Sequence, residues 1–196
     1  MTRDSRPARA AQLARTHRRL LDAAVGLFLD AGYAHTTVGA VVRAAGVSRA
    51  TFYAHFASKD AVLRELMTQV WDAATAEYAR FAELPDCSDA RVRGWLGGLL
   101  DAWQRYGPLT LLVNELLAAD LVAQSRERER RNVAVLLGDY RHWGHLPREE
   151  AGRRAQLLIF QLERCALEWV SGRWDEPREA LLGTLTRVWL ATLRAR

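Results

Sequence analysis

The chain has 196 residues, of which 49% are hydrophobic and 26% are charged. These proportions suit one globular domain, or a small module joined to one, and they exclude a disordered chain and a collagen-like fibre. The two cysteines are too few for a disulfide framework or a cysteine-rich zinc site, so we expect a reducing, cytoplasmic setting.

The net charge of +5 is concentrated in the first third of the chain. Residues 1–64 contain ten basic side chains and four acidic ones, whereas the remaining residues contain 18 basic and 19 acidic side chains. This asymmetry predicts an N-terminal part that binds a polyanion and a C-terminal part with another task. The alternative is a basic tail that only improves solubility.

The sequence predicts no membrane segment. It has no run of about 18 apolar residues, the length that a membrane-spanning helix needs. The first 19 residues are rich in arginine but lack the apolar block of a signal peptide. We therefore expect neither a membrane span nor secretion.

Apolar side chains recur at helical spacing along nearly the whole chain, and no alternating pattern is long enough for a strand. We therefore predict an all-α fold of about nine helices. Leu21, Ala24 and Phe28 share one face of the first helix, which is expected to end at Gly32. A second, short helix is expected to begin after Thr37.

The second predicted helix ends at Gly46, and Ser48 is suited to cap a third one that continues to about Phe56. Ser58 is suited to cap a long fourth helix, which Pro85 ends. Gly107-Pro108 is expected to stop the fifth helix. The helices predicted after the fourth are residues 89–106, 109–124, 125–143, 148–171 and 176–193.

Residues 38–56 show the pattern of a helix-turn-helix. Two short helices joined by a turn that contains Gly46 cross at a steep angle, because Val47 and Phe52 pack the second helix onto the first. The residues left facing outward are Arg49, Ala50, Thr51 and Tyr53. This surface suits the major groove of DNA, where an arginine binds guanine, a threonine methyl group contacts thymine, and a small residue permits close approach.

Other polar side chains near this pattern are suited to contact phosphates. They are Thr37, Tyr53, His55 and Lys59, of which the last lies beside the N-terminus of the fourth helix. Each has a purely structural alternative: Tyr53 as a half-buried core residue, His55 as a solvated turn residue and Lys59 as a surface charge. The basic arm before the first helix is expected to follow the DNA backbone or to enter the minor groove.

Many residue types recur here together at fixed spacing, and residues 18–67 resemble the N-terminal domain of TetR-family transcriptional regulators. The resemblance rests on Ala23-Ala24, Leu27-Phe28, Gly32-Tyr33, Thr36-Thr37-Val38, Ala45-Gly46-Val47-Ser48, Thr51-Phe52-Tyr53, His55-Phe56 and Ser58-Lys59-Asp60. The chain departs from the family pattern in having Ala50 where Gly is common and Asp60 where Glu is more frequent.

The resemblance implies a homodimeric, mostly repressing DNA-binding protein with a ligand-binding C-terminal domain. It implies phosphate or base contacts for Thr37, Ser48, Arg49, Thr51, Tyr53, His55 and Lys59. We accordingly expect a basic flexible arm at residues 1–14, a DNA-binding domain at residues 15–60, and an effector-binding and dimerisation domain at residues 61–196. The expected partners are a palindromic double-stranded operator, a second copy of the chain and a small-molecule effector.

The C-terminal part is rich in aromatic side chains, most of which we expect in the core. An effector pocket requires polar side chains among apolar ones, and mid-helix Gly97-Gly98 suggests a close helix contact or an adjoining cavity. A hydrophobic or aromatic effector is expected. The candidate pocket residues are Trp71, Trp95, Trp103, Asn114, Glu115, Phe160, Gln161, Arg164 and Glu168. Arg164 and Glu168 have the spacing to pair with each other instead.

The last two predicted helices, about residues 148–172 and 176–194, carry wider apolar faces than one core requires. We expect them to form the homodimer interface; the alternative is burial within one subunit. A two-fold dimer requires a near-palindromic operator with half-sites roughly 34–36 Å apart, or a multiple of this distance. An effector that favours a tilted fourth helix is expected to change the separation of the two recognition helices.

No catalytic motif is present, and we expect neither an enzyme nor a cofactor or metal. His142 and His145, with Asp139 nearby, are the one constellation similar to a metal site, but Gly144 and Pro147 interrupt the helix there and a surface turn is expected. Redox sensing through Cys87 is an alternative role for that thiol, whereas Cys165 is expected in the core. A DNA-binding regulator or architectural protein without an effector is the alternative function.

Overall fold

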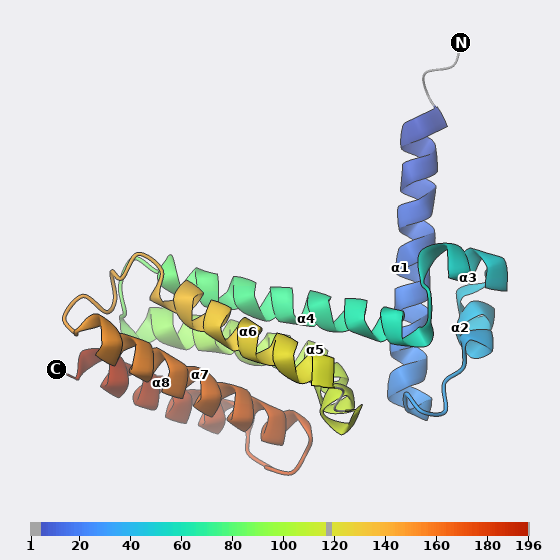
Figure 1. Cartoon of the computed structure of the whole chain (residues 1–196). Coiled ribbons are helices and arrows are strands. Elements are labelled where there is room, and N and C mark those ends of the chain that lie inside the picture. The colour runs from blue at the N-terminus through green and yellow to red at the C-terminus, as the bar shows by residue number, and fades with distance from the viewer. Residues whose placement is uncertain (1–4, 117–118, 196) are drawn as a thin grey trace. The chain divides into compact units, whose positions relative to one another are not determined.

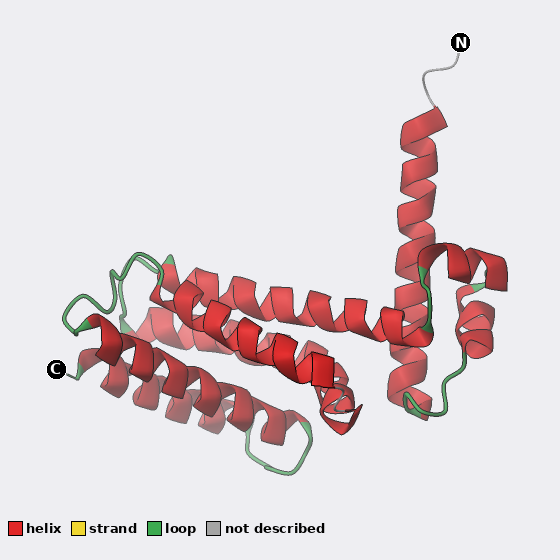
Figure 2. Cartoon of the chain, viewed as in Figure 1, coloured by secondary structure: helices red, strands yellow, loops and turns green. Residues whose placement is uncertain are grey.

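The computed structural model describes residues 5–116 and 119–195, except for the side chains of residues 5, 6, 108, 112–116 and 119–125. The described residues form helices joined by turns, with no strand among them (Figure 2), which confirms the all-α prediction. Figure 1 shows their order: α1 (Ser5–Ala31), α2 (Val38–Ala45), α3 (Arg49–His55), α4 (Lys59–Ala82), α5 (Asp89–Leu116), α6 (Ala119–Leu137), α7 (Arg148–Val170) and α8 (Arg178–Arg194).

The chain divides into two compact units, Met1–Gln69 and Val70–Arg196. Helix α4 contributes residues to both, because it begins at Lys59 and ends at Ala82. The division therefore falls about three turns inside α4, instead of near its start at residues 60–61 as the sequence suggested.

The caps predicted around α2, α3 and α4 are confirmed. The Thr37 hydroxyl accepts a hydrogen bond from the Ala40 backbone N–H at 3.1 Å, and the Ser48 hydroxyl accepts one from the Thr51 N–H at 3.0 Å. Gly46 ends α2 with a φ of 63°, a conformation that glycine adopts without strain. These local signals fix the short helices and the turn between them.

Phe52 holds α3 in the first unit. It is fully buried, and it is the one buried residue within α3, all of which the structure describes. Its ring lies 5.8 Å from that of Phe56, and the surrounding core includes the fully buried Leu20 and Phe28 of α1. Burial of one phenylalanine side chain stabilises the fold by about 1.5–3 kcal/mol, so the orientation of α3 depends strongly on this residue.

The predicted flexible arm differs from the structure. Helix α1 begins at Ser5, so residues 5–14 are helical, although residues 7–14 are exposed. Alanine and arginine favour helix, and Pro7 lies in the first turn, where its missing N–H breaks no helical hydrogen bond. The arginine-rich composition before the first apolar face led us to predict an arm, but exposed residues continue a helix when their propensity is high.

The second unit is a helical bundle with one hydrophobic core. Within it α5 packs against α7 and α8, and α6 packs against α7, as Figure 1 shows. Trp143 and Trp189 are fully buried there, and so are Phe81, Leu96 and Leu136. The core therefore draws on every long helix of this unit.

Two predicted helix boundaries in this unit are wrong. Helix α5 continues past Gly107-Pro108 to Leu116, and α6 runs without interruption from Ala119 to Leu137. Eight helices thus account for residues 5–116 and 119–195, where about nine were predicted. Tertiary packing explains the first error: a Cβ atom on Gly107 would lie 2.6 Å from Val170 Cγ2, so a close approach of α5 and α7 requires glycine there.

We predict opposite effects of alanine at two glycines of α5. Gly98 has open space around its Cα atom, so Gly98→Ala should raise the free energy of unfolding by about 0.5–1 kcal/mol through helix propensity. Gly107→Ala should lower it by about 1–3 kcal/mol, because the added methyl group overlaps Val170. Urea denaturation of both variants measures the difference. Equal stabilisation by both would contradict the close packing, and Val170→Ala should relieve the Gly107→Ala defect.

Candidate nucleic-acid interface and ligand pocket

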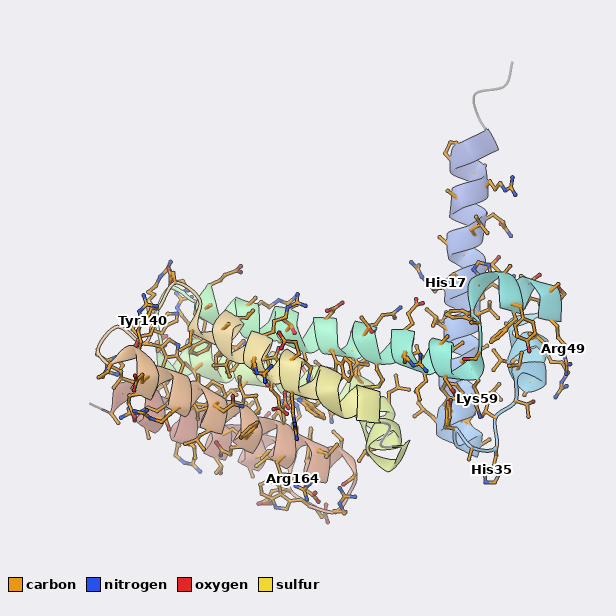
Figure 3. All side chains as sticks on the ribbon, viewed as in Figure 1. His17, His35, Arg49, Lys59, Tyr140 and Arg164 are labelled. Carbon is orange, nitrogen blue, oxygen red and sulfur yellow. The ribbon has the colours of Figure 1, made fainter. Side chains whose placement is uncertain are left out.

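The outer surface of α3 carries the residues that the sequence predicted for base contacts. Arg49 and Ala50 are exposed, Thr51 is half-buried, and 58% of the Tyr53 side chain is exposed. Figure 3 shows Arg49 on the side of α2 and α3 that lies away from α1. Because Phe52 is buried, its neighbours on α3 are turned outward, where a nucleic acid can reach them.

Two arginines gather at the first turn of α2. A Cβ atom on Gly39 would lie 3.2 Å from Arg49 Nη2, 3.6 Å from Thr37 Oγ1 and 3.7 Å from Arg43 Nη1. Among the described residues neither arginine forms an ion pair with a carboxylate. Their charge adds to the partial positive charge of a helix N-terminus, so this surface attracts phosphate groups. Arg43 was not predicted; its position one helical turn after Gly39 in the same helix was the available signal.

The two hydroxyl caps are exposed and close to these arginines. Ser48 Oγ lies 2.9 Å from Thr51 Oγ1 in addition to accepting the Thr51 N–H. Arg19 of α1 donates to the carbonyl oxygens of Ala45 and Gly46, which end α2. Arg19 thus fixes the turn before α3 and was not singled out in the sequence. Ser48 and Thr37 have structural tasks as caps, whatever else they contact.

Lys59 is held by the loop between α1 and α2. Its Nζ donates to the carbonyl oxygens of Tyr33 at 2.7 Å and Thr36 at 2.9 Å, and lies 4.0 Å from the centre of the Tyr33 ring. The Tyr33 hydroxyl donates to Asp60, and burial and this carboxylate raise the pKa of Tyr33. Lys59 therefore joins the loop to the start of α4, and its contact with phosphate stays a prediction.

His55 is half-buried beside a second histidine. Its ring lies 5.5 Å from that of His17, which stacks on Phe56 at 4.7 Å. His17 Nε2 lies 2.6 Å from Glu65 Oε1, so this pair links α1 to α4 within the first unit. The surroundings of His55 are thus more ordered than those of a solvated turn residue. Its contact with phosphate also stays a prediction.

These features define a helix-turn-helix module with a basic outer surface. Residues 20–66 match the family model described as bacterial regulatory proteins of the tetR family. The chain is 27% identical over 184 residues to the HTH-type transcriptional regulator EthR of Mycobacterium tuberculosis, which covers 89% of this chain and 85% of the relative. Over 62 residues it is 36% identical to the A-factor receptor protein of Streptomyces griseus, covering 32% of this chain and 22% of that protein.

Solved structures share the fold. A transcriptional regulator from Aquifex aeolicus aligns with a TM-score of 0.69 and 19% identity, covering 89% of this chain and 98% of its own. The fatty acid degradation regulator FadR from Bacillus halodurans also aligns with a TM-score of 0.69 and 19% identity, covering 92% and 97%. Residues 20–66 thus match the N-terminal DNA-binding domain of the TetR family, and over most of its length the chain is similar to TetR-family transcriptional regulators.

The second unit contains a pocket of about 30 Å³ that is partly open to solvent. Its walls are apolar and aromatic except for Thr110 and Arg128. Helix α4 contributes Val70 and Ala74, α5 contributes Leu99, Trp103 and Tyr106, and α6 contributes Arg128. A space of this size holds about one water molecule.

Of the candidate pocket residues with described side chains, Trp103 alone lines this pocket. Trp71 lies near it, because its ring centre is 5.7 Å from Arg128 Cζ, an atom of the pocket wall. Gln161 is half-buried on α7 and is not part of the lining. The side chains of Asn114 and Glu115 lie outside the described part of the structure.

Four of the pocket predictions differ from the structure. Trp95 belongs to the core, where its Nε1 donates to the Glu77 carbonyl at 2.7 Å. Phe160 is 46% exposed, and Arg164 is exposed and pairs with Glu168 at 2.7 Å, as the sequence alternative allowed. Figure 3 shows Arg164 on the bundle surface. Phe160, Arg164 and Glu168 follow one another at intervals of four residues on α7, so they share the face opposite the one that buries its core residues.

A polar cluster that the sequence analysis missed lies behind the pocket. Arg128 Nη2 donates to Glu163 Oε2 at 3.3 Å, and the Tyr78 hydroxyl donates to Glu163 Oε1 at 3.5 Å. Burial is the main reason that the pKa of Glu163 is raised, and burial also raises the pKa of Tyr78. Glu163 lies one helical turn from the apolar Ile159 and Leu167 of α7, which was the available sequence signal.

The other titratable groups singled out in the sequence do not form a metal centre. The described residues contain no group of three or more His, Cys, Asp or Glu side chains placed to hold a metal ion. Burial lowers the pKa of His142, whose ring lies 5.3 Å from that of Phe81. Burial raises the pKa of the half-buried Cys87 thiol, which reduces its thiolate fraction and weakens the redox alternative. None of the described helices is long and apolar enough to cross a membrane.

The raised pKa of Glu163 predicts a pH dependence of stability. The folded protein binds a proton at Glu163 more tightly than the unfolded chain, so this group lowers the free energy of unfolding as the pH rises above about 4.5, its ordinary value. We expect Glu163→Gln to remove this decline, as measured by urea denaturation from pH 4 to 8.

Glu168→Gln is the matched control for this experiment. The hydrogen bond from Arg173 lowers the pKa of Glu168, so that carboxylate stabilises the fold above its ordinary pKa and ceases to do so as the pH falls. The two variants should therefore change the slope of stability against pH in opposite directions. Identical profiles for wild type and Glu163→Gln would contradict the prediction.

Proposed function

We propose that the chain is a ligand-responsive repressor that binds a palindromic operator as a homodimer and is released by a small hydrophobic or aromatic effector. The match of residues 20–66 to the TetR family model supports the DNA-binding function, and the effector, the repression and the particular contacts are our proposal. The observation that carries it is the basic surface formed by Arg49, Arg43 and Thr37 at the first turn of α2. Such a surface has no role in packing the core. A regulator of this kind works in the cytoplasm, beside the chromosome.

In the proposed complex α3 lies in the major groove. Arg49 donates two hydrogen bonds to a guanine, the Thr51 methyl group contacts a thymine, and Ala50 permits close approach. Phosphates are bound by Thr37, Ser48, Tyr53, His55 and Lys59 and by the exposed basic start of α1. The exposure of Arg49, Ala50 and Tyr53 supports this arrangement.

Replacement of Arg49 tests the base contact. Arg49→Ala should weaken binding to the preferred operator by about 1–3 kcal/mol and relax the preference at one base pair, because it removes a bidentate donor. Fluorescence anisotropy on operator variants measures both effects after the operator has been selected from genomic fragments. Arg141→Ala, at an exposed turn of the second unit, is the control of equal charge change.

Lys59→Ala provides the contrast in the same experiment. It should weaken all sequences about equally and reduce the salt slope by about one. The substitution should also lower the free energy of unfolding, because Lys59 Nζ donates to two loop carbonyl oxygens. Binding is therefore measured at a temperature well below the unfolding transition. A loss confined to one base pair would contradict the phosphate role of Lys59.

Exposed apolar side chains on α7 and α8 support the proposed dimer. Leu157 is 66% exposed, and Phe160 and Val188 are also exposed. The apolar excess is smaller than the sequence suggested, because Leu181, Leu185 and most other large apolar residues of α8 are buried within the bundle. The remaining surface is nonetheless unusual for a helix pair that faces only water.

We expect a charge at the centre of this surface to weaken the dimer. Phe160→Glu should shift the protein toward monomer and lower operator affinity, because a buried carboxylate without a partner is unfavourable at an interface. Sedimentation velocity and operator binding are the measurements. Ala90→Glu, at an exposed position of α5, is the control. Retention of the wild-type dimer by Phe160→Glu would exclude this interface.

Helix α4 supplies the proposed connection between effector and operator. It begins at Lys59, and farther along it contributes Val70 and Ala74 to the pocket. An effector that prefers a tilted α4 would change the separation of the two α3 helices in a dimer and lower operator affinity. By linkage the operator must weaken effector binding by the same factor.

The second candidate function is DNA binding without an effector. The small volume of the pocket favours it. The discriminating measurement is the affinity of a pocket-bound small molecule with and without saturating operator. Equal affinities would support the second function and exclude effector release.

A further inference from the structure

The pocket beside Arg128 has a chemical character that limits what it binds. Its other described walls are apolar or aromatic apart from Thr110, whose hydroxyl donates to the Tyr106 carbonyl oxygen, and half-buried Trp103 and Tyr106 stand among them. Flat apolar molecules pack well against such side chains. Arg128 therefore supplies the charge on the described wall of the pocket.

That charge is already balanced. The Arg128 and Glu163 side chains are only 15% and 17% exposed, and they form an ion pair at 3.3 Å. A second carboxylate placed on Arg128 would lie close to Glu163 in a poorly solvated site, where two negative charges repel strongly. An uncharged molecule avoids this repulsion.

The site contains buried hydrogen-bond donors that lack an acceptor. Arg128 Nε and Asn132 Nδ2 are buried N–H donors without an acceptor among the described residues. The acceptor oxygen of Asn132 is already used, because it receives a hydrogen bond from Thr75 at 2.8 Å. Arg128 lines the pocket whereas Asn132 does not, so Arg128 Nε–H is the donor that a molecule in the pocket can satisfy. The group that would satisfy it is a hydrogen-bond acceptor.

We propose that this pocket binds an uncharged, flat, apolar molecule carrying a hydrogen-bond acceptor, and that Arg128 Nε–H donates to that acceptor. This inference rests on the proposed function in one respect, since it gives the chemical class of the effector. A ring the size of benzene exceeds about 30 Å³, so Trp103 and Tyr106 turn outward to admit it. Their displacement is the means by which the ligand acts on α4, on the opposite wall.

Three probes of nearly identical shape test the proposal. Benzamide is uncharged and has a carbonyl acceptor, 2-phenylpropene replaces that carbonyl by an apolar group, and benzoate carries a charge. Dissociation constants are measured by ligand-observed NMR at pH 7.5. We expect benzamide to bind about tenfold more tightly than each analogue, because 2-phenylpropene leaves a buried donor unpaired and benzoate adds an unbalanced charge.

The double variant Arg128→Met/Glu163→Gln shows whether Arg128 causes the preference. It removes both charges together, so no unpaired ion is buried, and it should abolish the advantage of benzamide over 2-phenylpropene. If this variant does not fold, Ala74→Phe serves instead: it narrows the pocket from α4 and should eliminate binding of all three probes. Ala90→Phe, at an exposed position of α5, is its control.

The proposal is overturned if benzoate binds most tightly, if 2-phenylpropene matches benzamide in the wild-type protein, or if the double variant keeps the preference. It is also overturned if no probe binds up to its solubility limit. Operator binding is measured on the same samples without probe. Failure of operator binding with intact probe selectivity refutes the proposed repressor function alone, whereas the reverse result refutes the ligand assignment alone.

Discussion

The burial of Phe52 is the constraint on which the DNA-binding surface depends. Helix α3 is too short to be stable by itself, and Phe52 is the side chain that attaches it to the core of the first unit. Because one residue faces inward, Arg49, Ala50 and Tyr53 face outward. Arg19 and the Ser48 cap then fix where the helix begins, so the recognition surface follows from a few local contacts.

The second unit differs from the first because it encloses charged side chains in an apolar helical bundle. Arg128 and Glu163 come from different helices and compensate each other at little exposure. Such pairs add little net stability compared with apolar packing. The pocket beside them combines the Arg128 donor with half-buried aromatic side chains, a composition typical of small-molecule sites.

The sequence predicted the first unit more accurately than the second. Caps at Thr37, Ser48 and Ser58 and the turn at Gly46 were correct because they are local: a hydroxyl accepts an N–H three residues away, and glycine adopts a positive φ. The candidate pocket was mostly misplaced. Phe160 has the more apolar neighbours in the sequence, yet Trp95 is buried in the core and Phe160 is exposed, because the rotation of each helix in the bundle decides which side chains are buried.

By itself the sequence determined the all-α fold, the helix-turn-helix and the residues that α3 presents, because helical period, caps and charge act within a few residues of one another. The tertiary structure alone decided that α5 continues through Gly107, that Lys59 holds the loop of Tyr33 and Thr36, and that Arg128 meets Glu163 beside a pocket. Each of these depends on residues distant in the chain, and their meeting is fixed by how the helices pack.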